Sequence, residues 1–392
     1  MKENNNFRHY LDWAATAIPD ETAGVNPELN RTGLFWGNPS SIHFEGRKAK
    51  EALENARSRC ANVFGVAPEK LYFTSGGTES NSIVLHSLLL GKRKGRLLYS
   101  EVEHPSVREN CLTLEKLGLQ VSAIGVEKDG RVTESTLSRA LEKYPDTRFI
   151  TVMGVNNETG ALMDIKALIK LVRLHQEKTR FPIHFHCDLV QAIGKVPLDI
   201  SGWETDSAAF SAHKLGGPRG IGLLYLKKPL RSVYSGGEQE GGVRPGTENP
   251  LGALAMSDAL ERQANPETVK IEEKKAGERF KYLLENLKKI KRCRIIPEDR
   301  EYEDRRFSPW IVQLRFKGVP GAVMVRALDD EGVSISTGSA CSSRVQERPV
   351  LKAMGVDKDA SLEGVRISQG WSTGRADLDA LLSGIEKALS FL

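Results

Sequence analysis

Residues 207–226, SAAFSAHKLGGPRGIGLLYL, contain two apolar runs joined by a glycine-rich turn that begins with one lysine. The runs 207–213 and 222–228 are typical of buried strands. A lysine side chain is normally solvated, but Lys214 stands at the end of a hydrophobic strand, where partial burial favours a neutral and nucleophilic amine. The stretch alone also fits a lysine at an ordinary strand end, so its meaning depends on which residues the fold brings near it.

Strands and helices alternate around this stretch. Helical spacing of apolar residues predicts helices over 47–66 and 81–91. Further strands are predicted over 71–80, which runs into a glycine turn, and over 96–100, 148–157 and 181–190. Such alternation predicts an α/β domain built on a mostly parallel sheet.

The pattern changes near residue 265. Residues 267–293 predict a long charged helix, and the Glu residues interleaved with its Lys residues favour a solvated helix over a site for acidic surfaces. A strand over 310–316 and helices over 320–332 and 376–392 follow. We therefore expect a large domain, 18–264, and a smaller α+β domain formed by 1–17 together with 265–392.

The composition argues against a nucleic-acid or membrane partner. The chain has 392 residues, 40% of them hydrophobic and 27% charged, and this length suffices for two domains. Its net charge of +5 comes from 56 basic and 51 acidic residues spread along the chain. No apolar run approaches the roughly 20 residues that span a bilayer, and the polar N-terminus lacks a signal peptide, so we expect a cytoplasmic protein.

The five cysteines are widely spaced and form no CxxC pair, which argues against a disulfide framework or a zinc ribbon. Cys60, Cys111 and Cys187 lie in helical or strand-like stretches and are predicted to be small buried side chains. Cys341 differs, because it stands alone among small polar residues in STGSACSSR, residues 336–344. That stretch alone indicates only a surface loop that carries a thiol.

A second unusual residue ends another apolar strand, within HFHCDLVQAIGK, residues 184–195. An unpaired Asp188 carboxylate would be costly there. A pyridoxal phosphate enzyme uses a lysine, which bonds the cofactor, and an acid, which keeps the pyridine nitrogen protonated. Gln191, one turn later, could bind the phenolic oxygen of that cofactor. Strand alternation puts His184 and His186 on the face of Asp188, but no further ligand cluster supports a metal site, and we predict none.

Three further motifs follow predicted strands. The turn in FTSGGTES, residues 73–80, offers the backbone N–H groups of Gly77 and Thr78 at a helix start, where they would cradle an anion. His104, in SEVEHPSV, could stack on a flat cofactor or relay protons, and Asn157 lies in GVNNETG. Because open α/β sheets bind ligands at the carboxyl ends of their strands, we expect these groups and Lys214 to meet there.

Taken in order, these motifs resemble those of the class V aminotransferase-fold, pyridoxal-phosphate-dependent enzymes, and within that group the cysteine desulfurases. The matching stretches span nearly the whole chain: LDWAATA (11–17), GNPSSIH (37–43), FTSGGTES, EHPSV, NNETG, HCDLVQAIGK, SAHKLGGPRGIG, GGVRPGTEN (241–249), STGSACSSR and VRISQG (365–370). The resemblance implies fold type I, like that of aspartate aminotransferase, with a large cofactor-binding domain and a smaller one. The GSAC signature resembles the subgroup with a long cysteine loop.

The resemblance also implies cofactor-binding roles for the matched residues. Lys214 is the expected Schiff-base lysine, and Asp188 is the expected partner of the pyridinium nitrogen. Gln191 and Asn157 are expected to hold the ring oxygen, His104 to stack on the ring, and Gly77, Thr78, Ser211 and His213 to bind the phosphate. Thr247 is expected to reach the phosphate of the neighbouring subunit, which implies a homodimer.

The implied reaction is that of a cysteine desulfurase. Arg366, together with Asn157, is expected to bind the carboxylate of L-cysteine. Lys214 or His104 would remove the α-proton, and the Cys341 thiolate would take the sulfur as a persulfide while L-alanine leaves. The persulfide would pass to an acceptor, such as an iron–sulfur scaffold or a tRNA-thiolation enzyme. A selenocysteine lyase, another class V aminotransferase or lyase, or a scaffold without cofactor are the alternatives.

Two stretches depart from the family pattern. Trp13 stands in LDWAATA where the family usually has asparagine, and SQGWSTG, residues 368–374, replaces a glycine-arginine run. Both lie toward the substrate entry or the small domain. We therefore expect them to affect substrate shape and partner contacts more than cofactor chemistry.

Overall fold

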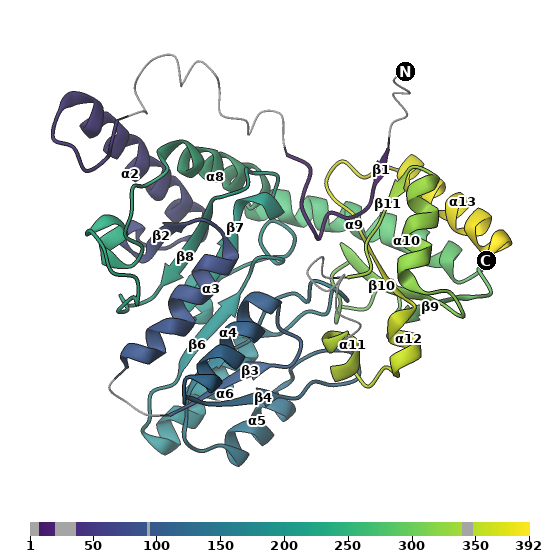
Figure 1. The fold of residues 1–392 in the computed structure, drawn as a ribbon, viewed down its shortest axis with the longest axis horizontal. Helices are drawn as coiled ribbons and strands as arrows, with labels where there is room; N and C mark the ends of the chain where they lie inside the picture. Colours follow the sequence, from purple (N-terminus) through teal and green to yellow (C-terminus); the bar gives the residue numbers. More distant parts are fainter. Residues whose placement is uncertain (1–7, 20–36, 92–94, 339–347) are drawn as a thin grey trace.

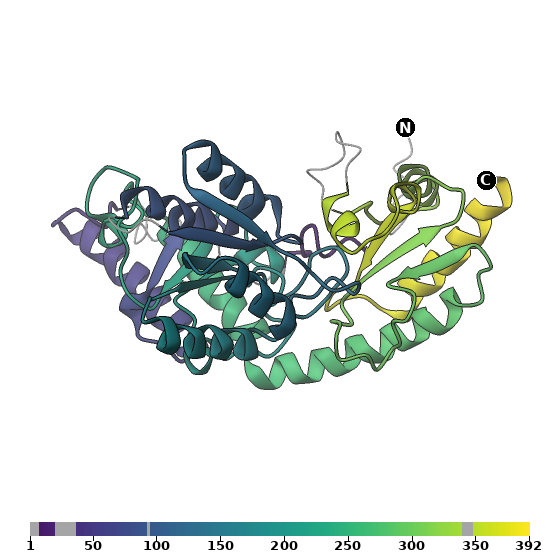
Figure 2. The same ribbon diagram turned by 90° about the horizontal axis from the view of Figure 1, so that it is seen from below.

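The computed structural model describes residues 8–19, 37–91, 95–338 and 348–392. Within them, two groups of elements lie side by side (Figure 1). The long helix α9 (Pro266–Leu287) runs along both groups and joins them (Figure 2). The larger group precedes α9 in sequence, and the smaller one mostly follows it.

A seven-stranded sheet forms the centre of the larger group. Its strands are β2 (Leu71–Thr74), β3 (Arg96–Ser100), β4 (Gln120–Ile124), β5 (Thr147–Thr151), β6 (His184–Asp188), β7 (Ser207–Ser211) and β8 (Gly222–Leu226). They lie in the order β2-β8-β7-β6-β5-β3-β4, and β8 alone among them pairs antiparallel, with both β2 and β7. The prediction of an α/β fold on a mostly parallel sheet is therefore confirmed.

Helices cover both faces of this sheet, so its central strands are buried on both sides. One face packs against α3 (Gly77–His86) and α4 (Pro105–Lys116), and the other against α2 (Phe44–Phe64), α5 (Glu134–Lys143), α6 (Ile165–Thr179) and α8 (Pro250–Gln263). The described residues of this group also include the short helix α7 (Ile200–Trp203) and the 3-10 turns η2 (Pro68–Lys70), η3 (Ser87–Leu90), η4 (Ala212–Lys214) and η5 (Gln239–Gly242). All five residues of β7 are buried, because side chains on both of its faces meet helices.

The smaller group has a three-stranded antiparallel sheet of β9 (Cys293–Ile296), β10 (Ile311–Phe316) and β12 (Gly364–Ser368), in the order β12-β10-β9. It packs on α9, α10 (Gly321–Asp330) and α13 (Arg375–Phe391). The chain start returns to this group, since β1 (His9–Tyr10) pairs in parallel with β11 (Val333–Ser334). The short helices α11 (Pro349–Ala353) and α12 (Lys358–Leu362) follow the undescribed segment 339–347.

The division into 18–264 and 1–17 with 265–392 stays our proposal. It is supported by a separate apolar cluster that joins Leu11 to residues of α9, β10 and α13. Helix α11 belongs to the smaller domain by its sequence position, but its Val350 and Leu351 pack into the apolar cluster of the large sheet.

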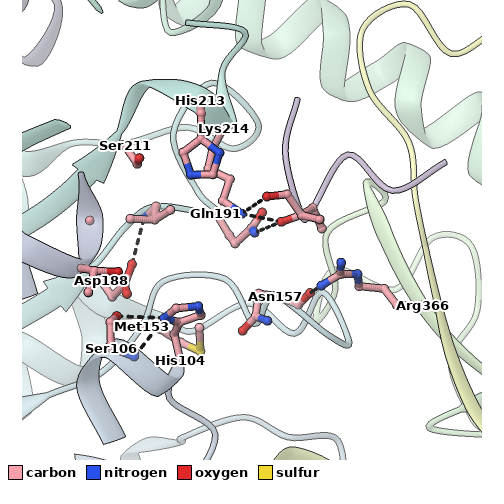
Figure 3. A pocket seen from close by; sticks show the side chains of 15 residues that line it. His104, Ser106, Met153, Asn157, Asp188, Gln191, Ser211, His213, Lys214 and Arg366 are labelled. Carbon is pink, nitrogen blue, oxygen red and sulfur yellow. Dashed lines mark hydrogen bonds between the residues drawn. The ribbon is translucent and has the colours of Figure 1, made fainter. Parts of the chain in front are cut away.

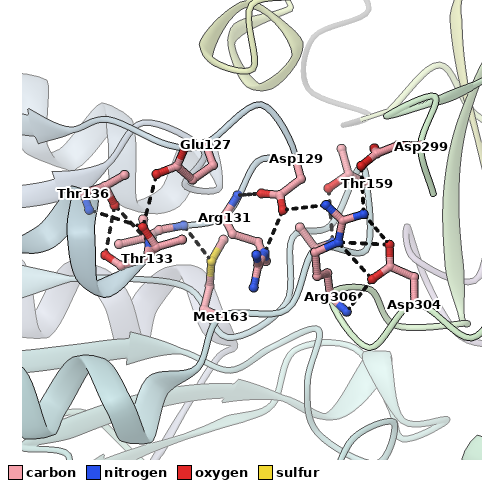
Figure 4. Close-up of polar contacts among 12 residues, drawn as sticks. Glu127, Asp129, Arg131, Thr133, Thr136, Thr159, Met163, Asp299, Asp304 and Arg306 are labelled. Atoms are coloured by element: carbon pink, nitrogen blue, oxygen red, sulfur yellow. Dashed lines mark hydrogen bonds and ion pairs between the residues drawn. The ribbon is translucent and has the colours of Figure 1, made fainter. Parts of the chain in front are cut away.

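Polar contacts tie the two groups together near the loop that follows β5 (Figure 4). Arg306 forms ion pairs with Asp304 at 2.7 Å and Asp299 at 2.9 Å, and it reaches Asp129 of the larger group at 3.3 Å. Arg131 bonds the same Asp129 at 2.9 Å. Asp129 therefore joins a cation from each group, which helps to fix the smaller group against the larger one.

The sequence placed most element types correctly but misjudged several boundaries. The strand predicted over 148–157 ends at Thr151, and the helix predicted over 81–91 begins at Gly77, within the predicted strand 71–80. The helix predicted over 267–293 ends at Leu287, and Cys293 already begins β9. The charged residues between them carry no glycine or proline to signal the end. The edge strand β4 was not predicted, because its side chains are mostly half-exposed and lack an apolar run.

The cysteines follow their prediction where the structure describes them. Cys60, Cys111 and Cys187 are fully buried, and Cys293 is buried as well. Burial raises the pKa of the Cys60 and Cys187 thiols to about 12, so both stay protonated and unreactive. Cys341 lies outside the described residues. Within the described part of the chain, no helix has the length and apolar character needed to cross a membrane.

Candidate active site

A cavity of about 230 Å³ opens at the carboxyl ends of the central strands (Figure 3). Its lining consists of Ala14, Ala15, Gly77, Thr78, His104, Ser106, Met153, Asn157, Asp188, Val190, Gln191, Ser211, His213, Lys214 and Arg366. Asp188 and Ser211 are the last residues of β6 and β7, and Lys214 follows β7 by one short turn. The sequence prediction that these groups meet at one edge of the sheet is confirmed.

Asp188 is 4% exposed and has two hydrogen-bond donors. The Asn81 side chain donates from Nδ2 to Oδ2 at 2.8 Å, and the Val190 backbone N–H donates to Oδ1 at 3.0 Å. The partners that a buried carboxylate needs are therefore present. Asn81 was missed in the sequence, although it lies one turn into the helix that starts at the predicted glycine turn.

Lys214 and Gln191 share a partner on the opposite wall. The Lys214 amine donates to the backbone oxygens of Ala14 at 2.6 Å and Ala15 at 2.7 Å, and Gln191 Nε2 donates to the Ala14 oxygen at 2.7 Å. Behind Gln191, the buried Lys195 donates to its Oε1 at 3.1 Å. Burial, with the nearby Lys214 and Arg366 charges, lowers the pKa of Lys195 to about 7. Gln191 therefore presents the amide N–H groups, not its oxygen, to the cavity.

His104 is the N-cap of α4, and its ring is oriented by that helix. The Ser106 backbone N–H donates to His104 Nδ1 at 3.1 Å, and Ser106 Oγ lies 2.8 Å from the same atom. Burial lowers the pKa of His104; Asp188 opposes that shift, while Lys214 and Arg366 add to it. The neutral ring accepts at Nδ1 and so carries its proton on Nε2. Figure 3 shows the Nε2 side of the ring directed toward the middle of the residues that line the cavity.

The predicted anion cradle opens into an adjoining pocket lined by Thr16, Gly77, Thr78, Ser211, His213 and Arg219, among others. Gly76 precedes α3 with φ of 150°, a conformation that favours glycine, and a Cβ on Gly77 would come within 2.5 Å of Val190 Cγ2. The first N–H groups of α3 face this pocket without helical partners. Burial lowers the pKa of His213 to about 4, so its ring is neutral here. Arg219 is a cation at this pocket that the sequence reasoning missed.

Arg366 reaches the cavity from the smaller group. It lies on β12, is 1% exposed, and donates from Nη2 to Asp12 Oδ1 at 2.7 Å and from Nη1 to the Asn157 backbone oxygen at 2.9 Å. Figure 3 shows Arg366 and Asp188 on opposite sides of the residues that line the cavity. Asp12 was not identified from the sequence as the partner of Arg366, because 354 positions separate the two residues.

Among the described residues, Thr247 is the predicted site residue that does not line the cavity. Thr247 is exposed and lines neither pocket of its own chain, although Arg244 of the same turn forms an ion pair with Glu79 of α3 at 3.3 Å. Cys341 lies outside the described residues. The described part of its stretch begins beside the cavity, because the Ser336 and Arg366 backbones pair with each other.

The two histidines before Asp188 are hydrogen-bonded to a hydroxyl. His184 Nε2 and His186 Nδ1 lie 2.7 and 2.8 Å from Ser207 Oγ. Burial lowers the pKa of His184 to about 4 and that of His186 to about 3, so both rings are neutral. Over residues 8–19, 37–91, 95–338 and 348–392, no three acidic, histidine or cysteine side chains gather as a metal site would require.

The two departures from the family pattern contact each other. The Trp13 ring packs on Gly370, where a Cβ would lie only 1.9 Å from Trp13 Cδ2, and it meets the edge of Trp371 at a centroid distance of 5.9 Å. Trp371 in turn lies 5.9 Å from Trp310. A tryptophan at position 13 therefore requires a glycine at position 370. Trp13, Trp371 and Trp310 form one aromatic cluster beside Ala14.

Comparisons with known proteins agree with the fold and the site. The sequence model of the family described as aminotransferase class-V matches residues 9–381. The chain is 34% identical over 390 residues to the cysteine desulfurase IscS of Dictyoglomus turgidum, covering 98% of this chain and 95% of that relative. It is 36% identical over 360 residues to a NifS/IcsS protein homolog of Lactobacillus delbrueckii subsp. bulgaricus, covering 90% of each. The solved structure of a NifS-like protein is similar with a TM-score of 0.88 and 30% identity, covering 98% of this chain and 100% of that one.

Proposed function

Because this chain belongs to the class V aminotransferase family and is a pyridoxal-phosphate-dependent cysteine desulfurase, we propose that the cavity at Lys214 is its active site. The family and fold type I predicted from the motifs are confirmed. The observation that carries the proposal is the meeting of Lys214, Asp188 and Arg366 around one cavity.

The residues of the cavity fit pyridoxal phosphate. A buried carboxylate, a lysine amine and an anion cradle lie around a single space, and Gly77 has no room for a larger side chain. We propose that Asp188 pairs with the ring nitrogen, Gln191 and Asn157 with the ring oxygen, and that His104 stacks on the ring. The phosphate would lie at Gly77, Thr78, Ser211 and His213. When bound, the cofactor supplies an electron sink for negative charge at the substrate's α-carbon.

The hydrogen bonds divide the proton transfers between two residues. His104 Nδ1 is occupied by Ser106, and the neutral ring carries a proton on Nε2, so His104 can donate toward the cavity but not accept there. The Lys214 amine is therefore the base that we assign to the α-proton. Of the two bases left open by the sequence, the geometry favours Lys214.

Arg366 is proposed to bind the substrate carboxylate, in exchange for its bond to Asp12. We expect Arg366→Gln to raise the KM for L-cysteine roughly tenfold to hundredfold, the effect of losing hydrogen bonds to a charged group, with a smaller change in kcat. Steady-state kinetics would measure this, with the visible spectrum confirming bound cofactor. Arg315→Gln, on the neighbouring strand and paired with Glu363, is the matched control. An unchanged KM would show that another residue binds the carboxylate.

Cys341 is proposed as the acceptor of the sulfur. The C–S bond of L-cysteine breaks as the thiolate of Cys341 bonds to that sulfur, which yields an enzyme persulfide and L-alanine with no outside oxidant. Support comes from the sequence stretch, which is similar in order and context to the family's, and from the burial of Cys60, Cys111, Cys187 and Cys293. No buried thiol of that set can reach a substrate in the cavity without unfolding its surroundings.

Partners and location are also proposals. A homodimer is supported by Thr247, which is exposed in the single chain and stands in the turn whose Arg244 pairs with Glu79 of α3. Light scattering that gave the mass of one chain would contradict it.

The persulfide would pass to an iron–sulfur scaffold or a tRNA-thiolation enzyme. The protein would work in the cytoplasm, which cell fractionation tests.

The function is tested by product formation from L-cysteine. We expect equimolar L-alanine and sulfide in the presence of a thiol reductant, and faster alanine release when a true acceptor protein is added. Amino-acid analysis and sulfide detection measure both products. Alanine formed only from selenocysteine would identify a selenocysteine lyase instead, and transamination without sulfur release would identify another class V enzyme.

A further inference from the structure

We propose that Asn81 is a positioning residue that links the charge of Asp188 to the protonation of His104. Asn81 is fully buried on α3 and is not among the residues that line the cavity. Its amide nevertheless contacts three groups, at distances of 2.8 Å to Asp188 Oδ2, 2.9 Å to Ser106 Oγ and 2.9 Å to His186 Nε2. The inference rests on the roles proposed above for Asp188 and His104.

The orientation of the Asn81 amide is determined by the carboxylate. An ionised Asp188 only accepts hydrogen bonds, so the NH₂ group of Asn81 must face it and the amide oxygen must face His186. His186 is neutral, because burial lowers its pKa to about 3, and it must therefore carry its proton on Nε2 to donate to that oxygen. Its Nδ1 is then the acceptor for the Ser207 hydroxyl.

The same orientation fixes the hydroxyl of Ser106. The second N–H of the Asn81 amide donates to Ser106 Oγ, which leaves the Ser106 proton directed to His104 Nδ1 at 2.8 Å. A donor at Nδ1 stabilises the neutral ring, as does the Ser106 backbone N–H. A single amide therefore orients the carboxylate proposed for the ring nitrogen and favours the proton on Nε2 of the histidine proposed to stack on the ring.

Two substitutions of Asn81 separate these effects. Asn81→Asp keeps the size and the acceptor for His186 but replaces the NH₂ group by an oxygen about 2.8 Å from Asp188, where two carboxyl groups must share one proton. Asn81→Ala removes the donors without adding a carboxyl group. In the cofactor-free protein we expect the pKa of His104 to rise in both variants, because Ser106 loses the donor that directs its proton to His104. The cations that face His104, Lys214 and Arg366, are the same in both variants.

The measurement is an NMR titration of isotope-labelled histidines in cofactor-free protein, with the His104 signal assigned by its loss in His104→Gln. Cofactor affinity, measured by equilibrium dialysis, should also fall about tenfold in both variants, since Asp188 loses a charged hydrogen bond. Ser82→Ala is the matched control, because Ser82 neighbours Asn81 on α3 and accepts from Asn110, whose amide reaches Ser106 at the backbone oxygen and not at the hydroxyl. It should change neither quantity.

A double-mutant cycle with Ser106→Ala tests the route of the coupling. The pKa of His104 should not respond to Asn81→Ala once Ser106 lacks its hydroxyl, whereas the loss of cofactor affinity should persist. An unchanged His104 pKa in both Asn81 variants overturns the proposal, and if neither variant folds, an unchanged His104 pKa in Ser106→Ala overturns it. A shifted pKa with unchanged cofactor affinity would support the network and contradict the cofactor role of Asp188.

Discussion

Lys214→Ala is expected to abolish both the covalent attachment of the cofactor and the turnover of L-cysteine. Lys214 is the lysine among the cavity's lining residues, and its amine lies against the Ala14 and Ala15 oxygens, opposite Asp188 across the cofactor space. The variant loses the nucleophile that bonds the cofactor and the base assigned to the α-proton. Because a general base alone contributes about 10² to 10⁴ in rate, we expect a loss of at least 10³-fold.

Three measurements separate this result from simple misfolding. Borohydride reduction followed by mass spectrometry should attach the cofactor to Lys214 in the native protein and to no residue in the variant. The visible band of the lysine-bound cofactor should disappear. Circular dichroism should be unchanged, because the large sheet and its apolar cluster do not depend on this side chain. Retention of the visible band in Lys214→Ala would mean that another lysine holds the cofactor.

Lys227→Ala is the matched control for a lysine that follows a strand. Lys227 comes directly after β8, as Lys214 comes shortly after β7, but it is not among the residues that line the cavity. Its backbone bonds Asp206 and its side chain is partly exposed. The control should keep the cofactor, its spectrum and its turnover.

The site was predictable where its residues stand at the end of a strand or within a few residues after it. Lys214, Asp188, His104 and Asn157 each stand near the end of an apolar run, and parallel strands bring such ends to one edge regardless of the distance between them in sequence. The glycine turn at 76–77 carried its own signal, because its backbone conformation and close contacts exclude other residues.

Residues that act through other residues were not predictable in this way. Asn81 is a polar residue inside a helix, Lys195 looks like a surface lysine, and Asp12 precedes its partner Arg366 by 354 positions. Their roles depend on tertiary contacts with groups from other elements, so no local pattern reports them. The pairing of Trp13 with Gly370 is of the same kind, since each departure from the family motif makes sense only beside the other.

Cys341→Ala is expected to leave the cofactor spectrum and Lys214 attachment intact while abolishing persulfide formation from L-cysteine. The thiolate is the attacking species, and burial raises the pKa of Cys60, Cys187 and Cys293 to about 12, so none of these thiols can substitute. Alanine release should fall about 10²-fold or more, because losing a nucleophile or its activation typically costs that much.

Mass spectrometry of protein treated with L-cysteine and then alkylated should find one added sulfur on Cys341 in the native protein and none in the variant. Cys293→Ala, which removes a buried thiol, should behave as native in this assay. A persulfide on another cysteine, or unchanged alanine release in Cys341→Ala, would contradict the assignment and point to sulfur leaving the cavity directly.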